Sequence, residues 1–217
     1  MPTASTWLVC FDLGGVVIRI HRDWAGAIEA AGLSVRDASA LATHGQELAA
    51  LSARYQSGRM RCEGYAKAVS ETLAGLYTPS EIGAIHRAII RELYPGVTQL
   101  IAGLRARGIA TAALSNTNAT HWQQVSGWSV FAHFDHVVLS HAIGAVKPDA
   151  AAYDAVQRQT GTAAANILFF DDVQAHVDAA RALGWHAEQI NPDAAPAVQV
   201  EAHLRRYGIL DSPRSGS

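Results

Sequence analysis

Cysteine is scarce in this sequence, since only Cys10 and Cys62 occur among its 217 residues. Two thiols, one of them inside an apolar run, cannot form the disulfide framework that stabilises small secreted proteins. We therefore expect a reducing compartment, the cytoplasm, and a fold that depends on a hydrophobic core. The length and the hydrophobic share of 49% allow one full α/β core domain and a small accessory domain.

Long hydrophobic runs and an excess of positive charge are also missing. The longest apolar stretch is far shorter than the roughly 20 residues that a membrane-spanning helix needs. Lys and Arg total 17 against 19 Asp and Glu, and no basic stripe marks a nucleic-acid-binding surface. We expect neither a membrane nor a nucleic acid as a partner, and a monomer or weak homodimer. An anionic small molecule would have to be bound by local groups in a site.

What the sequence does contain is an alternation of apolar runs and helical patterns. Strands are predicted at residues 7–11, 109–114, 136–139, 167–170 and, more weakly, 186–190. Helices are predicted between and after them, at residues 98–107, 119–125, 149–159 and 197–207. This alternation predicts an α/β fold: a Rossmann-like parallel sheet with helices on both faces.

The pattern changes between residues 24 and 93. Ala and Leu recur there at helical spacing, with breaks near Gly32, Gly58 and Pro79, and no segment is a convincing strand. We expect several helices that form a small all-helical cap domain. The predicted domains are an α/β core made of residues 1–20 and 94–217, and a helical cap made of residues 21–93.

Polar side chains follow the predicted strands of the core. Because parallel strands end at one edge of a sheet, these side chains should meet there. The set contains carboxylates, a hydroxyl, an amide and a cation. It suits phosphoryl transfer, which needs a nucleophile, hard oxygen ligands for a divalent metal, and donors for phosphate oxygens. Its members are Asp12, Ser115, Asn116, Thr117, Lys147, Asp171 and Asp172.

These residues lie in four stretches that resemble, in order and spacing, the motifs of the haloacid dehalogenase-like superfamily. The stretches are Phe11–Val16, Leu114–Asn118, Val146–Asp149 and Phe169–Asp172. The chain resembles the branch with a helical cap, and is especially similar to bacterial α-D-glucose-1-phosphate phosphatases. The resemblance implies a magnesium-dependent phosphatase that acts on a small phosphorylated metabolite, a sugar phosphate such as glucose 1-phosphate.

The resemblance also implies roles for single residues. Asp12 would be the nucleophile and form an aspartyl-phosphate. Ser115 and the backbone N–H groups of Asn116 and Thr117 would hold phosphate oxygens, and Lys147 would neutralise charge on nucleophile and phosphate.

A second set of implied roles concerns Mg²⁺. Asp172, Asp12 and the carbonyl of Gly14 would be its protein ligands. Asp171 would orient Lys147 through a salt bridge, or contact the metal through water.

The chain departs from the superfamily pattern at Gly14. Most phosphatases of the superfamily carry there a second Asp, which protonates the leaving oxygen; such catalysis contributes about 10²–10⁴-fold. Gly14 permits three interpretations: a leaving group that needs little help, such as an anomeric oxygen; a proton from another group, His176 or His21; or a protein that only binds phosphorylated ligands. Both histidines are more simply explained as ordinary exposed residues.

A 2-haloacid dehalogenase is a further alternative, because those enzymes also lack the second Asp. They need no metal, however, and the pair Asp171–Asp172 is typical of a metal site, so we favour the phosphatase. In the cap, the segment Tyr55–Met60 occupies the place of a substrate-contacting turn in related proteins. Gln56 or Arg59 would face the substrate there, unless the segment is a plain helix–helix loop.

Overall fold

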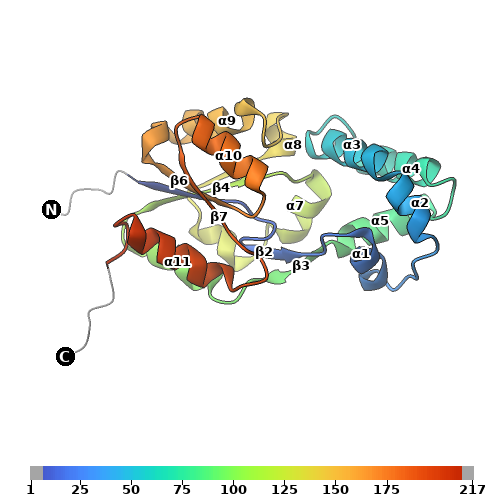
Figure 1. The fold of residues 1–217 in the computed structure, drawn as a ribbon, viewed down its shortest axis with the longest axis horizontal. Coiled ribbons are helices and arrows are strands. Elements are labelled where there is room, and N and C mark those ends of the chain that lie inside the picture. The colour runs from blue at the N-terminus through green and yellow to red at the C-terminus, as the bar shows by residue number, and fades with distance from the viewer. Residues whose placement is uncertain (1–6, 212–217) are drawn as a thin grey trace.

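The computed structural model describes residues 7–211 and contains one five-stranded parallel sheet (Figure 1). The strand order is β5-β4-β1-β6-β7, so that the first strand of the chain lies in the middle. The predicted Rossmann-like sheet is confirmed. The strands are β1 (Leu8–Phe11), β4 (Ala110–Ser115), β5 (His136–Leu139), β6 (Ile167–Asp171) and β7 (His186–Gln189).

Helices cover both faces of the sheet because its strands are apolar on both sides. In β1, Val9 and Phe11 pack with α6 (Val97–Ala106) and α11 (Pro196–Arg206). Leu8 and Cys10 point to the opposite face and pack with helices α9 and α10. This alternation follows from the two-residue period of a strand. The helices of the second face are α9 (Ala150–Thr160) and α10 (Gln174–Ala182).

Short helical segments connect the strands of the core. They are α7 (Ala119–Val125), the 3₁₀ segment η1 (Ser129–His133), α8 (Ser140–Ile143) and the 3₁₀ segment η2 (Ala164–Asn166). Within residues 7–211, no helix has the length and apolar character needed to cross a membrane.

Residues 24–88 form a helical unit with a hydrophobic cluster of its own, to one side of the sheet in Figure 1. Buried Ile28, Tyr65, Val69 and Ile82 are among the side chains of this cluster. The predicted helical cap is therefore part of the fold. Its helices are α1 (Trp24–Ala30), α2 (Ala38–Thr43), α3 (Gly45–Gln56), α4 (Cys62–Thr72) and α5 (Pro79–Ala88).

The prediction that residues 24–93 lack a strand is wrong at the end of that range. Strand β3 (Ile90–Leu93) pairs antiparallel with β2 (Ile18–Ile20). The sequence signal is weak because β3 is short and its two central residues are charged and exposed, so that it resembles the last turn of α5. Its partner β2 is distant in sequence. We propose that this ribbon is the junction between cap and core; the boundaries at residues 20 and 93 remain predictions.

A second contact joins the cap to the core at the C-terminal end of α3. Ser140 Oγ donates a hydrogen bond of 2.6 Å to the carbonyl of Gln56. The hydroxyls of Tyr55 and Thr120 are also 2.6 Å apart. Gly58 has φ +71°, and a Cβ there would come within 2.5 Å of the His141 carbonyl oxygen. The cap thus packs closely against the core at a point beyond the β2–β3 ribbon.

Candidate active site

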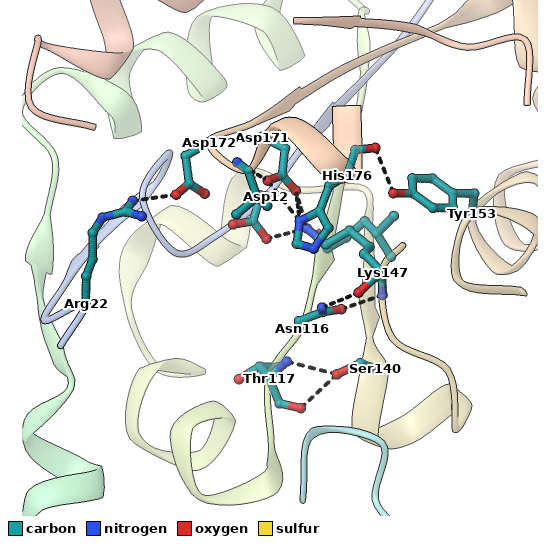
Figure 2. Close-up of polar contacts among 12 residues, drawn as sticks. Asp12, Arg22, Asn116, Thr117, Ser140, Lys147, Tyr153, Asp171, Asp172 and His176 are labelled. Atoms are coloured by element: carbon teal, nitrogen blue, oxygen red, sulfur yellow. Dashed lines mark hydrogen bonds and ion pairs between the residues drawn. The ribbon is translucent and has the colours of Figure 1, made fainter. Parts of the chain in front are cut away.

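The predicted site residues converge at the carboxyl edge of the sheet (Figure 2). Ser115 and Asp171 end strands β4 and β6, and Asp12 directly follows β1 between them. Lys147 reaches the same point from the loop before α9. All four residues are buried. The fold therefore brings together side chains from four separate parts of the sequence.

The centre of the site is the ammonium group of Lys147. Its Nζ atom donates to Asp12 Oδ1 and Asp171 Oδ2, each at 2.6 Å, and to the Leu114 carbonyl at 2.9 Å. These three bonds use all three protons of the ammonium group. Burial alone would lower the pKa of Lys147, but the two carboxylates outweigh it and raise that pKa. Lys147 is therefore a permanent, fixed positive charge.

The two carboxylates beside Lys147 differ in their protonation. Burial raises the pKa of Asp12 to about 7, because Lys147 offsets only part of the desolvation and both Asp171 and Asp172 repel its charge. Burial also acts on Asp171, but Lys147 and His176 outweigh it and lower the pKa of Asp171 to about 2. Asp171 is thus the constant partner of Lys147, whereas Asp12 lacks full charge compensation.

Asn116 positions Lys147 through the backbone. Its side-chain amide donates to the Lys147 carbonyl and accepts from the Lys147 N–H, both at 2.8 Å. The N–H of Thr117, predicted to hold a phosphate oxygen, donates instead to Ser140 Oγ at 2.9 Å. A phosphate could use that N–H only after the bond to Ser140 breaks. No local sequence pattern indicates Ser140, which lies outside the four motif stretches.

His176 is a second residue that differs from its prediction. It is not an ordinary exposed side chain: only 15% of the side chain is exposed, and Nδ1 lies 3.1 Å from both oxygens of Asp171. The reason is that His176 lies in the first turn of α10, which begins shortly after β6 ends at Asp171. Asp171 also accepts the Val173 N–H at 2.8 Å. Both of its oxygens are therefore engaged by the protein.

Asp172 faces the opposite side of the site from Lys147. Its carboxylate is 4% exposed and forms an ion pair of 2.5 Å with Arg22, from the segment that enters the cap. Both groups press against Gly15, where a Cβ would lie 2.3 Å from the guanidinium and 2.7 Å from the Asp172 carboxyl carbon. Gly15 also has φ +86°. Only glycine fits this position.

Three carboxylates can converge on one cation here. One oxygen each of Asp12, Asp171 and Asp172 lies within 4.8 Å of the others. Hard carboxylate oxygens are the ligands that Mg²⁺ prefers, so the donor set fits this ion. Since Asp171 is bonded to Lys147, Val173 and His176, Asp12 and Asp172 are the carboxylates with coordination capacity to spare. The salt bridge between Lys147 and Asp171 is present, and the metal roles of Asp12 and Asp172 stay predictions.

A cavity of about 140 Å³ lies between core and cap beside these residues. Ser115, Asn116 and Thr117 line it from the core, and Gln56 and Tyr65 from the cap. Arg59 is not among its lining residues; this side chain borders a separate hollow near Gly144 and Asp149. Of the two cap residues considered for substrate contact, only Gln56 reaches the cavity.

A match to a known protein family identifies the family of this chain. A model of the family described as "haloacid dehalogenase-like hydrolase" matches residues 8–184, which include the whole site. The chain belongs to this family. The hydrolase family predicted from the four sequence stretches is thus confirmed, and with it the class of enzyme.

Curated relatives of this hydrolase carry phosphatase names. Phosphatase MT3486 of Mycobacterium tuberculosis is 29% identical over 154 residues, 66% of this chain and 71% of the relative. Sesquiterpene phosphatase astK of Aspergillus oryzae is 33% identical over 127 residues, 56% of this chain and 63% of the relative. Enolase-phosphatase E1 of Serratia proteamaculans is 27% identical over 123 residues, 55% of this chain, which spans 53% of that relative.

Solved structures of the family share the fold. A family enzyme of Bacteroides thetaiotaomicron, in complex with magnesium and inorganic phosphate, has a TM-score of 0.69 at 21% identity, covering 85% of this chain and 93% of its own. The L-2-haloacid dehalogenase of Xanthobacter autotrophicus has a TM-score of 0.62 at 23% identity, covering 84% of this chain and 76% of its own. At these identities the likeness concerns the fold alone.

The raised pKa of Asp12 predicts a pH-dependent effect of Asp12→Asn on stability. The folded-state pKa of about 7 lies above the ordinary 3.8, so the ionised carboxylate destabilises the fold. This penalty is absent below the ordinary pKa and complete above pH 7. In EDTA, the unfolding temperature of Asp12→Asn relative to that of wild type should therefore rise between pH 5 and pH 8.

Thermal unfolding of both proteins across this pH range measures the difference. Asp149→Asn is the control, because Asp149 is exposed and its side chain makes no capping bond. A difference between wild type and Asp12→Asn that does not change with pH would contradict the assignment of Asp12 as an undercompensated buried carboxylate.

Proposed function

We propose that this hydrolase is a magnesium-dependent phosphatase that cleaves small phosphate monoesters through an aspartyl-phosphate on Asp12. The observation that carries the proposal is the arrangement around Lys147. Asp12, directly after the central strand β1, lies 2.6 Å from the ammonium group of Lys147. Carboxylate oxygens of Asp171 and Asp172 lie close enough to share one metal ion with it. The phosphatase names of three relatives agree with it.

The charges of the site explain why a metal would be needed. Asp12, Asp171 and Asp172 carry three negative charges when ionised, against two positive charges on Lys147 and Arg22. The difference, one negative charge, repels a phosphate dianion. When bound, Mg²⁺ would reverse the sign of the site, polarise the phosphoryl group and lower the pKa of Asp12, so that it is ionised at neutral pH.

In the first chemical step, an oxygen of Asp12 attacks phosphorus, and the bond between phosphorus and the ester oxygen breaks. The ester oxygen leaves as an alkoxide or phenoxide and becomes the alcohol by taking a proton from water. In the second step, water attacks the phosphorus of the aspartyl-phosphate and releases inorganic phosphate, which restores Asp12. Lys147 holds Asp12 in place and balances charge on the phosphoryl oxygens, while Ser115 offers a hydroxyl to one of them.

Gly14 restricts the leaving group, because no side chain there can protonate the departing oxygen. Leaving groups of low basicity meet this condition without help. Two kinds are the anomeric oxygen of a sugar 1-phosphate, such as the glucose 1-phosphate expected from the sequence, and a phenolic oxygen. His176 is a poor substitute for the missing acid, because its Nδ1 is directed at Asp171.

Two other functions remain distinguishable from this one. A protein that only binds phosphorylated ligands is motivated by Gly14, and a dehalogenase by the shared fold. The three-carboxylate cluster favours a metal-dependent reaction over the dehalogenase. The cytoplasm as compartment, and a monomer or weak homodimer, stay predictions from the sequence.

Phosphate release with Mg²⁺ tests the proposal directly. Wild type should release phosphate from acetyl phosphate and aryl phosphates, and Asp12→Asn should lose at least 10³-fold in kcat, because the nucleophile is gone. A cooperative thermal unfolding transition in the absence of ligand serves as the fold control for the variant. Binding without any turnover in wild type would establish the phospho-ligand binder instead.

Gly14→Asp tests the role of the missing acid. Gly14 does not have a positive φ, so an aspartate is compatible with its backbone. The added Cβ would lie 3.1 Å from Ile20 Cδ1, the end of a side chain that can shift. Across substituted phenyl phosphates, the rate of wild type should depend steeply on the basicity of the leaving group, and Gly14→Asp should flatten this dependence. A shallow dependence in wild type would mean that another proton donor is present.

A further inference from the structure

The cavity between cap and core is lined mainly by apolar side chains. On the core side these include Leu13 and Val125, and Ile18 and Ile20 come from β2. The other apolar lining residues are Ile89, Ile90 and Trp122, together with the rings of Tyr55 and Tyr65. The same cavity is bordered by Gly14 and by Ser115–Thr117. A group that leaves from phosphorus held at Asp12 and Ser115 would therefore enter an apolar space.

The aromatic rings of the cap form a connected wall. Tyr55 and Tyr65 stack with ring centroids 4.7 Å apart, and His86 lies 5.2 and 5.0 Å from them. His86 in turn stacks on His121 of α7 at 4.0 Å. Burial, helped by His121, lowers the pKa of His86 to about 3, and burial also lowers the pKa of His121. This wall is aromatic and uncharged at neutral pH.

Most polar groups of the cavity are already bonded to one another. The Asn118 oxygen accepts the N–H of His121, so its amide nitrogen is the donor toward His86 Nε2 at 3.0 Å. His121 Nε2 donates to the His86 carbonyl at 2.8 Å. The hydroxyl pairs Ser52–Tyr65 and Tyr55–Thr120 lie at 3.3 and 2.6 Å.

Few hydrogen-bonding groups therefore remain for a ligand. Asn116 is bonded at both ends of its amide to Lys147. Within residues 7–211, His86 Nδ1 has no partner, and the side chains of Gln56, Ser115 and Thr117 form no hydrogen bond with the protein. A sugar would bring several hydroxyls into a space whose wall is mainly apolar. A hydroxyl that is buried there without a hydrogen-bond partner weakens binding.

We propose that the leaving group is a single aromatic ring, and that the substrate class of this phosphatase is the aryl phosphate monoesters rather than the sugar phosphates. The inference rests on the proposed function. Two independent features lead to it: Gly14 requires a leaving oxygen of low basicity, which a phenol provides, and the cavity offers an apolar, aromatic space. A volume of about 140 Å³ also suits one ring, since a cavity of about 150 Å³ binds benzene.

The first test compares three substrates of wild type with Mg²⁺. Acetyl phosphate reports the phosphatase chemistry with no ring in the cavity. Phenyl phosphate should have a kcat/KM at least tenfold above that of glucose 1-phosphate. If glucose 1-phosphate is cleaved as well as phenyl phosphate, the substrate class is wrong. If no substrate, acetyl phosphate included, is turned over in an Asp12-dependent way, the phosphatase itself is wrong.

The second test changes the cavity wall. Ile90 and Leu93 both lie on β3, are both half-buried and pack against the same core cluster, but only Ile90 lines the cavity. Ile90→Thr should lower kcat/KM for phenyl phosphate about tenfold, the effect of a poorer match in an apolar pocket, and leave acetyl phosphate unchanged. Leu93→Thr, the control, should leave both unchanged. An equal loss for both substrates in Ile90→Thr would overturn the inference.

A third measurement needs no variant and involves no leaving group. Phenylphosphonate and methylphosphonate are not hydrolysed and differ only in the ring. As competitive inhibitors of acetyl phosphate hydrolysis, phenylphosphonate should bind at least tenfold more tightly. Equal inhibition constants would show that the cavity does not hold a ring.

Discussion

The buried ammonium group of Lys147 is the interaction on which the active site depends. It lies between Asp12 and Asp171 at 2.6 Å from each, with no exposure of its side chain. Removing one partner of a buried pair leaves the other charge uncompensated, which typically costs about 3–5 kcal/mol. The three strand ends that carry Asp12, Leu114 and Asp171 are therefore tied together by one side chain. The two hydrogen bonds between the Asn116 side chain and the Lys147 backbone hold the loop that carries Lys147 in place.

The cap completes the site through a separate set of contacts. Ser140 accepts the Thr117 N–H and donates to the carbonyl of Gln56 at the end of α3. The hydroxyl of Ser140 thus couples the position of the cap to the conformation of the loop that carries Thr117. On the cap side, the wall consists of aromatic rings and of polar groups that are already hydrogen-bonded to one another. The cavity next to Gly14 is therefore mainly apolar. Gly14, which offers no side chain for acid catalysis, also borders the cavity that we propose selects the leaving group.

Much of the fold and of the site follows from local sequence signals. The parallel sheet is predictable because each strand is an apolar run followed by a helix, and Asp12 and Asp171 are predictable because strand ends meet at one edge. Strand β3 escaped prediction because Arg91 and Glu92 interrupt its apolar pattern and its partner is far away in sequence.

The contacts between distant segments could not be read from the sequence either. Nothing local indicates that Arg22 pairs with Asp172 or that Ser140 accepts the Thr117 N–H. The apolar character of the cavity is also a tertiary property. Its wall combines residues of β2, β3, α3, α4, α5 and α7, and the cap helices α3, α4 and α5 are distant in sequence from the four motif stretches.

The central claim is a division of labour: Asp171 holds Lys147, and Asp172 serves the metal. Titration of turnover with Mg²⁺ in Asp171→Asn and Asp172→Asn tests it most directly, with calorimetric Mg²⁺ affinities of both variants as a second readout. Asp172→Asn should bind Mg²⁺ more weakly and recover part of its activity at high Mg²⁺, because a charged ligand has been lost. Asp171→Asn should bind Mg²⁺ nearly as wild type and remain impaired at any concentration. Equal loss of affinity and equal recovery in the two variants would contradict the account.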